Sequence, residues 1–225
     1  MIAVNNTRRA KLNVYQELKD RIQYLEMMPG EPIKESTLTE KLGVSRTPIR
    51  EALIRLSSED LIDIYPQRGT YVSEINFAIA KECAYMRHIL DSDVCLKLCR
   101  EKANLEDDLE DSLFFMKKAI KNKDVRGYIQ NDNSFHAAIF RAAGHEMTWD
   151  IIADSRAHYN RVLTLDLRRK GIMRKSLNEH LEMIRLIREG KEEELVRLMD
   201  IHHDYSSMDQ RESELRKEFP DYFKS

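Results

Sequence analysis

Residues that interrupt helices are scarce in this chain. Its 225 residues include seven glycines and five prolines, and every proline except Pro220 lies at or before residue 66. Beyond about residue 78, apolar residues recur at spacings of three and four, which predicts amphipathic helices. We therefore expect an all-helical second part, joined to the first by a linker at 73–76. The expected helices are 77–100, 105–121, 124–143, 146–169, 173–189 and 192–208.

Cysteine is also scarce, and this argues against a secreted disulfide scaffold. The three cysteines, Cys83, Cys95 and Cys99, are odd in number and form no CxxC pair, a usage typical of a reducing cytosol. Cys95 and Cys99 are four residues apart and could bind a soft metal, but packing in a core is the favoured reading. No stretch approaches the roughly 18 apolar residues of a membrane span, and no signal-like N-terminus is present. We expect a cytoplasmic protein without a membrane partner.

The length suits two domains with a core each, and we place them at 1–75 and 76–225. The fold class that we expect is mainly α. Overall charge gives little guidance, because the chain carries a formal net charge of −2. Residues 1–76 hold eleven Lys plus Arg and eleven Asp plus Glu, a net charge of zero. A binding function must therefore be inferred from residue patterns.

The strongest pattern is a glycine turn between two short helical segments. Residues 35–42 form the first segment, with apolar Leu38 and Leu42, and Gly43 permits a sharp turn. Ser45 can cap the second helix, whose first turn tolerates a proline. Arg46 and Arg50 then lie four residues apart on one helix face, from which each could reach a base edge or a phosphate in a major groove. The pattern is typical of a helix-turn-helix motif.

A β-hairpin follows this motif. Residues 61–65 and 70–73 are rich in β-branched and aromatic side chains, and the sequence Pro66-Gln67-Arg68-Gly69 between them predicts a turn. Such a hairpin is a wing, and its tip would bring Arg68 to the minor groove while Gly69 allows close approach to the sugar-phosphate chain.

In their order, these motifs resemble the DNA-binding domain of the GntR family. The matching residues run from Pro29-Gly30 through Leu38, Leu42 and the run 44–53 to the sequence Arg68-Gly69-Thr70-Tyr71-Val72. The resemblance implies a winged helix-turn-helix regulator that binds double-stranded operator DNA. Its DNA-contacting positions correspond here to Ser45, Arg46, Thr47, Arg50 and Gly69, to which the hairpin adds Arg68.

Such a role requires a division of charge, since the segment is neutral overall. We expect the acidic residues at 35, 40, 59, 60 and 63 to face away from the groove. The basic residues expected on the opposite side are Arg8, Arg9, Lys11, Arg46, Arg50 and Arg68.

Four residues of the helical part could bind a metal ion. Asp132 and His136 are one helical turn apart, which places a carboxylate and an imidazole on one face. His180 lies ten residues before Gly190 and His202 twelve after it. If Gly190 closes a helical hairpin, both histidines lie about 15–18 Å from the turn and face a common point. Spacing alone leaves satisfied or solvated histidines an equally good interpretation.

The same positions resemble the FCD ligand-binding domain of the fatty-acid-responsive (FadR) branch of GntR regulators. In that family the matching aspartate and three histidines bind a metal, which implies a divalent ion at Asp132, His136, His180 and His202. One carboxylate with three imidazoles suits zinc best, with nickel, manganese or iron as alternatives. His203 lies about 100° around the helix from His202, so we expect it to be an exposed neighbour, and we read His145 as a helix-boundary residue.

The resemblance further implies that a small organic acid completes the metal coordination. Arg87 matches the arginine that opens the family's first FCD helix, while Arg156 and Tyr159 should border the bundle cavity. Either arginine could bind a carboxylate through two donors, although a surface or intersubunit ion pair is an equally good interpretation. We expect a homodimer that reads a short palindrome, with DNA affinity set by the acid. A metal-responsive sensor and, more remotely, a metal-dependent enzyme are the competing classes.

Overall fold

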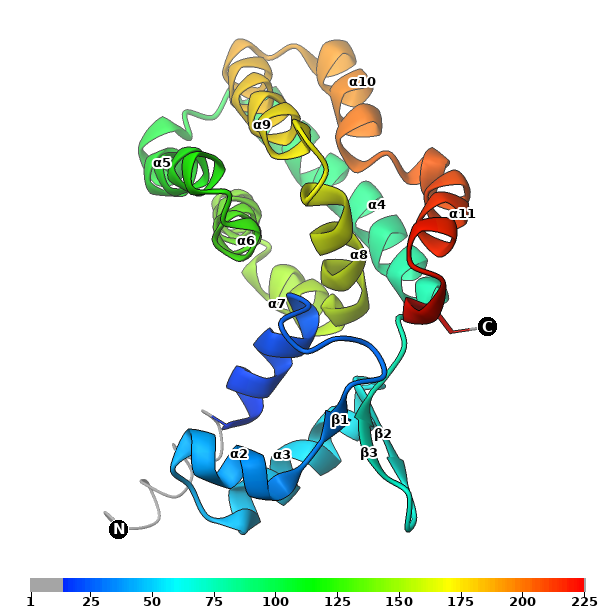
Figure 1. Cartoon of the computed structure of the whole chain (residues 1–225). Helices are drawn as coiled ribbons and strands as arrows, with labels where there is room; N and C mark the ends of the chain where they lie inside the picture. The colour runs from blue at the N-terminus through cyan, green and yellow to red at the C-terminus, as the bar shows by residue number, and fades with distance from the viewer. Residues whose placement is uncertain (1–13, 225) are drawn as a thin grey trace, which may run out of the picture. The chain divides into compact units, whose positions relative to one another are not determined.

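The computed structural model describes residues 14–224, which form two compact units (Figure 1). The N-terminal unit comprises the described residues up to Phe77 together with those from Leu215 onward, and the helical unit comprises Ala78–Glu214. The fold is mainly helical with a small N-terminal sheet, as the sequence predicts.

The N-terminal unit is built from a helix-turn-helix and a three-stranded sheet. A helix at residues 14–23 precedes these elements. Gly43 ends the first helix of the motif in the left-handed region at φ 66°, and its N–H donates to the carbonyl of Thr39. The predicted glycine turn is therefore present. The elements that follow residues 14–23 are β1 (Pro32–Ile33), α2 (Glu35–Leu42), α3 (Arg46–Ser58), β2 (Ile62–Tyr65) and β3 (Gly69–Val72).

The sheet has the order β1-β3-β2, and both pairings are antiparallel. Strands β2 and β3 form the predicted wing, with Tyr65 opposite Gly69 at its tip and Ile62 opposite Val72 at its base. Ile62 and Val72 are both 1% exposed, so the base of the wing is anchored in the core of the N-terminal unit. Its tip extends from there.

The helical unit consists of packed α-helices. Within it, α5 lies beside both α6 and α9, and α9 pairs with α10 (Figure 1). Gly190, at φ 71°, ends α9 in the left-handed region and makes the predicted tight turn into α10. The helices are α4 (Phe77–Glu101), α5 (Glu106–Asn122), α6 (Val125–Ala142), α7 (Glu146–Ser155), α8 (Ala157–Leu167), α9 (Ile172–Glu189), α10 (Glu192–His203) and α11 (Met208–Glu218), with short 3-10 turns η1 (Tyr205–Ser207) and η2 (Pro220–Tyr222).

Two predicted helices differ from the observed ones. The predicted helix 146–169 is broken at Arg156, which closes α7 and precedes α8, and it ends earlier, at Leu167. The predicted helix 192–208 ends at His203, because Asp204 adopts a left-handed conformation at φ 44°. Another helix, α11, follows it. Neither break contains a glycine or a proline, the residues that interrupt helices most often. His145 precedes α7 as its N-cap residue, as predicted for a helix boundary.

The three cysteines are free and buried. Cys95 lies against Met183, with 3.8 Å between the sulfur atoms, and Cys99 lies 3.5 Å from the carbonyl oxygen of Leu186. Burial raises the pKa of each of the three thiols. They pack in the core, as the sequence favours.

No helix among the described residues is both long enough and apolar enough to span a lipid bilayer.

Candidate functional site

Helix α3 presents its predicted contact residues on one exposed surface. Ser45, Arg46, Thr47 and Arg50 are all exposed, whereas Ile49 and Leu53 on the opposite side are buried. Ser45 occupies the N-cap position, but its hydroxyl makes no capping hydrogen bond. The apolar side of α3 thus fixes the helix on the core, and the polar side carries the residues that could meet DNA.

Arg50 is held by an acidic residue of α2. Its Nε lies 2.9 Å and 3.1 Å from the two carboxylate oxygens of Glu35, and its side chain remains 61% exposed. Glu35 therefore faces the same surface as Arg50. The expectation that this acid faces away from the arginines is wrong, because the turn at Gly43 folds the start of α2 over α3.

At the wing tip, Arg68 and Gly69 are both exposed. Gly69 has φ 113°, a conformation that side chains other than glycine rarely adopt. The Tyr71 hydroxyl donates to the carbonyl oxygen of Arg68 over 2.9 Å, and the Arg68 guanidinium lies 5.6 Å from the centre of the Tyr65 ring. These contacts order the tip and leave the guanidinium accessible to an anion.

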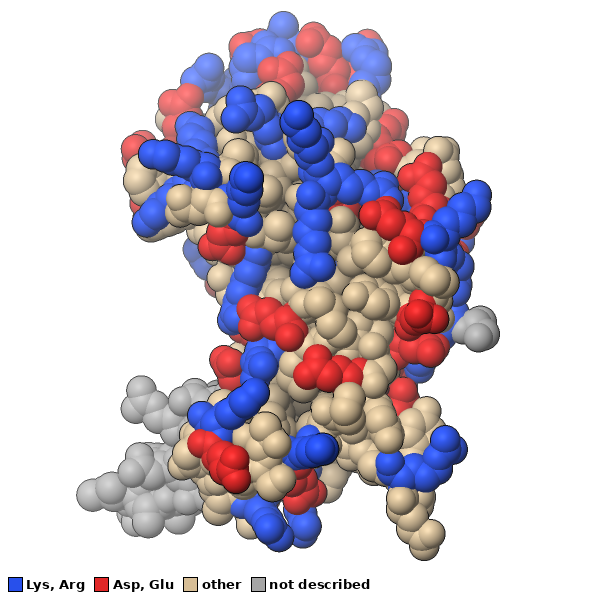
Figure 2. Space-filling model, viewed as in Figure 1, with Lys and Arg blue, Asp and Glu red and all other residues tan. Residues whose placement is uncertain are grey.

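Charge on the surface follows the balance seen in the sequence. Figure 2 shows basic and acidic side chains intermixed over the visible face. Arg8, Arg9 and Lys11, which belong to the predicted basic side, lie outside the described residues. Any DNA interface therefore depends on individual side chains and their placement.

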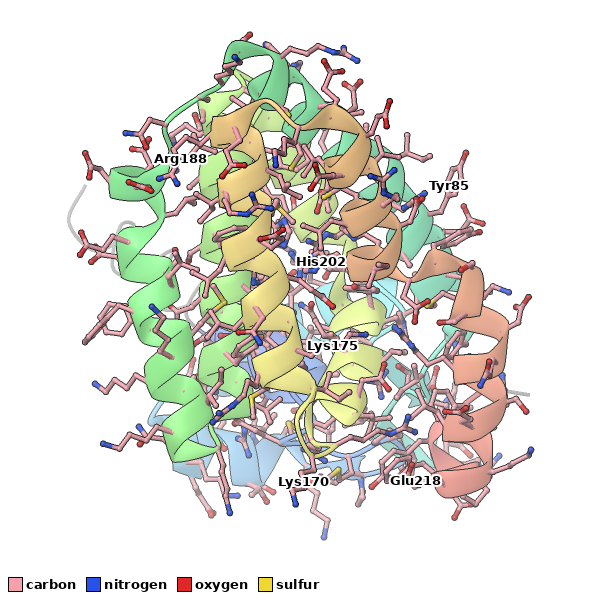
Figure 3. All side chains as sticks on the ribbon, turned by 90° about the horizontal axis from the view of Figure 1, so that it is seen from above. Tyr85, Lys170, Lys175, Arg188, His202 and Glu218 are labelled. Atoms are coloured by element: carbon pink, nitrogen blue, oxygen red, sulfur yellow. The ribbon has the colours of Figure 1, made fainter. Side chains whose placement is uncertain are left out.

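Within the helical unit, the four predicted metal ligands come together from three helices. Asp132 and His136 lie on α6, His180 on α9 and His202 on α10. Nitrogen atoms of the three histidines all lie within 4.8 Å of one another. An Asp132 carboxylate oxygen is 3.3 Å from Nε2 of His180 and 3.9 Å from Nε2 of His136. In Figure 3, His202 lies toward the middle of the unit, while Tyr85 and Arg188 lie at its periphery.

These side chains have the properties of metal ligands. His136 and His180 are 0% exposed, and Nε2 of each ring makes no hydrogen bond within the described residues. Burial, together with the charge of Arg87, lowers the pKa of His136 to about 4. Burial and the neighbouring imidazoles hold the pKa of His180 well below its usual value. Both rings are therefore neutral, and a bound cation would offset the cost of burying their Nε2 atoms without a hydrogen bond.

Two further carboxylates orient the imidazoles. Nδ1 of His202 lies 3.0 Å from a carboxylate oxygen of Glu179, and Nδ1 of His136 lies 3.1 Å from one of Asp91. Such carboxylate–histidine contacts fix the tautomer that directs Nε2 toward a metal. Asp91 and Glu179 were not among the sequence-predicted residues. Glu179 precedes a predicted ligand directly, but Asp91 lies on α4 and gives no local signal.

His203 differs from its prediction. It is 6% exposed, and its Nε2 lies 3.4 Å from the same oxygen of Asp91 that faces His136. The prediction of an exposed neighbour is wrong, because the end of α10 packs against α4 as well as facing the histidine cluster. A residue 100° around a helix from a buried one is exposed only when the helix is covered on a single side, and the end of α10 is covered on two.

The three predicted effector residues lie around the same cluster. Arg87 is 2% exposed and binds Asp91, with its Nη2 2.8 Å from the carboxylate and its Nη1 3.9 Å from Asp132. Arg156 is 1% exposed, and only its Nη2 has a hydrogen bond, to Asn160; Nε and Nη1 have no partner among the described residues. Both guanidiniums lie over the ring of Trp149, at 5.7 Å and 5.2 Å from its centre.

A cavity of about 400 Å³ reaches this cluster from the surface. Its lining includes Tyr159, Glu179, His202 and His203. Charged residues of the α8–α9 connection and of α11 also line it, among them Arg169, Arg211 and Glu214. The cavity is large enough for a small molecule of a few carbon atoms and gives it a route to the histidines.

The sequence of the chain matches those of known proteins over nearly its whole length. Residues 10–72 match the family model of the bacterial regulatory proteins of the gntR family, and residues 82–205 match the model of the FCD domain. The chain is 27% identical to the helix-turn-helix transcriptional repressor RspR of Escherichia coli K12, over 98% of this chain and 96% of the repressor. It is 28% identical to a helix-turn-helix regulator from an unstable DNA locus of Streptomyces ambofaciens, over 84% and 80% of the two chains.

The fold also has solved counterparts. A crystal structure of a GntR-type transcriptional regulator from Rhodococcus sp. RHA1 superimposes with a TM-score of 0.73 at 19% identity, covering 90% of this chain and 97% of the other. At that identity the likeness concerns the fold alone.

Proposed function

Because the chain belongs to the GntR family of bacterial regulators and carries an FCD domain, we propose that a small organic acid bound at a metal ion in the helical unit controls its affinity for operator DNA. The chain is a DNA-binding transcriptional regulator and not an enzyme. We further propose that it belongs to the fatty-acid-responsive (FadR) branch of these regulators, because of the Asp132, His136, His180 and His202 pattern. Its site of action would be the cytoplasm.

The DNA-contacting set that we propose lies on α3 and at the wing tip. A recognition helix in the major groove with a wing beside the minor groove covers only a few base pairs, so a homodimer would read a short palindrome. The proposed residues are Ser45, Arg46, Thr47, Arg50, Arg68 and Gly69.

The metal ion that we propose is divalent, with zinc first and nickel, manganese or iron as alternatives. Asp132, His136, His180 and His202 would hold it through one oxygen and three nitrogens. When bound, it would supply a positive charge that accepts carboxylate oxygens. The protein's own contribution is to keep the imidazoles of His136 and His180 neutral and buried, and to orient those of His136 and His202 through Asp91 and Glu179.

Within the described residues, the unpaired donors of the buried Arg156 support an organic acid as the effector. Asp91 neutralises Arg87, whereas two donors of the buried Arg156 have no partner among the described residues. A buried guanidinium with unused donors is costly unless an anion binds it. A carboxylate would satisfy both donors in the two-pronged geometry that arginine favours. A regulator that senses the metal ion alone would leave this cost unexplained.

The test is a thermal-shift screen of small carboxylates on the zinc-loaded chain, followed by anisotropy titration of an operator duplex with the hits. We expect an acid that stabilises the zinc-loaded chain and changes DNA affinity. Arg156→Gln should abolish the response and retain zinc, whereas Arg141→Gln on the surface of α6 should retain both. Circular dichroism would verify that each variant is folded.

Three outcomes would contradict parts of this proposal. DNA release by zinc alone, with no acid effective, would favour the metal sensor. Full metal content in His180→Ala, measured by elemental analysis, would remove that histidine from the ligand set. A monomer in sedimentation at micromolar concentration, free or on DNA, would remove the homodimer.

A further inference from the structure

The chain crosses between its two units a second time within α11. Residues of this helix up to Glu214 belong to the helical unit, and those from Leu215 belong to the N-terminal unit. The first crossing lies at the start of α4, between Phe77 and Ala78. The chain therefore joins the two units covalently at two places.

The first turns of α11 form part of the wall of the cavity. Arg211 binds two carboxylates of the helical unit, with Nε 3.2 Å from Asp166 and Nη2 3.1 Å from Asp204. One turn later, Glu214 lies 3.4 Å from Nη1 of Arg169. Arg211 and Glu214 line the same cavity as His202. Arg211 and Glu214 thus tie the first turns of α11 to the helical unit beside the cavity, together with the ion pair of Lys81 with Asp209 and the buried side chain of Met208.

The residues after α11 pair with the backbone of the N-terminal unit. The N–H of Ile75 donates to the carbonyl oxygen of Tyr222 over 2.6 Å, and the N–H of Lys224 donates to the carbonyl oxygen of Ile75 over 3.1 Å. These bonds form a parallel β-bridge between Ile75 and Phe223. The Phe223 ring, 4% exposed, packs on Phe77 with 5.9 Å between ring centres.

Ile75 is three residues beyond β3, the strand that leads back from the wing tip. It is fully buried, and Ser73 between them is bonded on both its backbone and its side chain, to Leu61 and Asp60. A shift at Ile75 therefore reaches the wing through a short, ordered stretch of backbone. No flexible loop intervenes.

We propose that α11 and the tail 219–224 form a regulatory strap that couples the cavity to the wing. The inference rests on the proposed function for the nature of the signal. A carboxylate entering the cavity competes with Asp166, Asp204 and Glu214 for the guanidiniums of Arg211 and Arg169, because all are anions that bind the same donors. An exchange of partners moves the start of α11, and the backbone bonds at Ile75 carry the change to the wing.

The strap is tested by a double-mutant cycle that needs no effector. Arg211→Ala removes the ion pairs of α11 with Asp166 and Asp204, and Lys224→Pro removes the N–H that bonds to Ile75. Lys224→Ala, which keeps that N–H, is the matched control. The probe is a duplex selected by the wild-type chain from a random-sequence pool, and the readout is its dissociation constant by anisotropy.

We expect Arg211→Ala to change the dissociation constant at least about fivefold in the wild-type and Lys224→Ala backgrounds, the range typical of allosteric coupling. In the Lys224→Pro background the change should be less than about twofold, close to the limit of additivity for independent sites. An equal effect in all backgrounds would overturn the proposal and leave the tail a purely structural clamp. So would the absence of any effect in the wild-type chain.

A second variant guards against misfolding. If Lys224→Pro loses helical content by circular dichroism, Phe223→Ser replaces it, since it weakens the packing on Phe77 and keeps the backbone intact; the same outcomes are expected. Because the cycle contains neither metal nor acid, its failure would leave the proposed metal and acid site standing. Failure of the carboxylate screen would equally leave the cycle interpretable.

Discussion

Arg50 has a partner that DNA would have to displace. Its guanidinium is bound to Glu35, and both side chains are partly exposed. An exposed ion pair contributes about 0–1 kcal/mol, so exchanging Glu35 for a phosphate or a guanine edge costs little. Glu35 also places a negative charge next to the surface that would face the phosphates. If this surface binds DNA as proposed, Glu35 would lower the non-specific affinity for DNA.

Arg50→Ala should weaken operator binding by about 1–3 kcal/mol, the usual contribution of an arginine at a base edge. Glu35→Gln should strengthen binding, by up to about 1 kcal/mol, because it frees Arg50 and removes a repulsive charge. Glu40→Gln on the same helix is the control for loss of an acidic residue. Anisotropy titrations at a fixed salt concentration measure all three, and unchanged affinity in Arg50→Ala would remove it from the interface.

Glu179 is expected to be a positioning residue for the metal. Glu179→Ala should lower zinc affinity about 10- to 100-fold, the usual effect of losing a carboxylate that orients a ligating histidine. Glu182→Ala, one turn further along α9 and bound to Arg185, should leave zinc affinity unchanged. Competition with a chromophoric chelator gives the two affinities. Equal affinities in the two variants would leave Glu179 without a role at the metal.

Individual residues show where sequence patterns are sufficient. The spacing of Asp132 with His136, and that of His180 and His202 about Gly190, each predict a pair on one face from helix geometry and one turn, whereas the prediction that the two pairs meet comes from the resemblance to the FCD domain. Asp91 and His203 could not be found in this way. Their contact joins α4 to α10, and helical periodicity carries no information on which distant helix lies against a given face.

Among the elements, the helix at residues 14–23 is held to the end of α3 by Glu59. The Tyr15 hydroxyl donates to its carboxylate over 2.6 Å, and Nζ of Lys19 lies 2.9 Å away. Burial alone would raise the pKa of Glu59, but the hydrogen bonds from Tyr15 and Lys19 and the charge of Lys19 hold it below its usual range. The ionised carboxylate thus stabilises the packing of the two helices.

Glu59→Gln should destabilise the N-terminal unit by about 1–3 kcal/mol at pH 7, the usual contribution of hydrogen bonds to a charged group. Since the folded pKa lies below the unfolded one, this contribution is complete above the unfolded value of about 4.5 and is lost as the pH falls through the folded value. Urea unfolding at pH 7, 5 and 3 should show the difference between wild type and variant shrinking with acidity. A constant difference would mean that packing, and not charge, holds the two helices together.

Helix boundaries were predictable where a residue forces them. Gly43 and Gly190 adopt the left-handed conformation that glycine favours, and both end helices as the sequence predicts. The break at Arg156 has no such residue, and local sequence therefore gave no signal for it. Helix α11 is strongly polar. Its buried apolar residues among those described are Met208 and Leu215, which are seven residues apart, and two such residues are too few for a recognisable apolar stripe.

For the whole molecule, adding or removing the metal ion should change the stability of the helical unit and leave that of the N-terminal unit unchanged. Zinc at 100 times its dissociation constant would stabilise the helical unit by about 2.7 kcal/mol. Hydrogen exchange should therefore slow in α6, α9 and α10 when zinc is added to the chelator-treated chain, while α2 and α3 remain unchanged apart from any effect of DNA. His180→Ala should show no zinc response. Slower exchange in that variant would place the ion elsewhere.

The buried thiols have a consequence for the environment in which the regulator could work. Oxidants react with thiolates, and burial raises the pKa of Cys83, Cys95 and Cys99, so little thiolate forms. The proposed metal ligands are nitrogen and oxygen atoms. Peroxide oxidises thiolate ligands and so releases zinc from them, but it does not oxidise imidazole or carboxylate ligands in this way. Such a regulator would keep reporting on its metabolite during oxidative stress, when proteins with thiolate-bound zinc lose their metal.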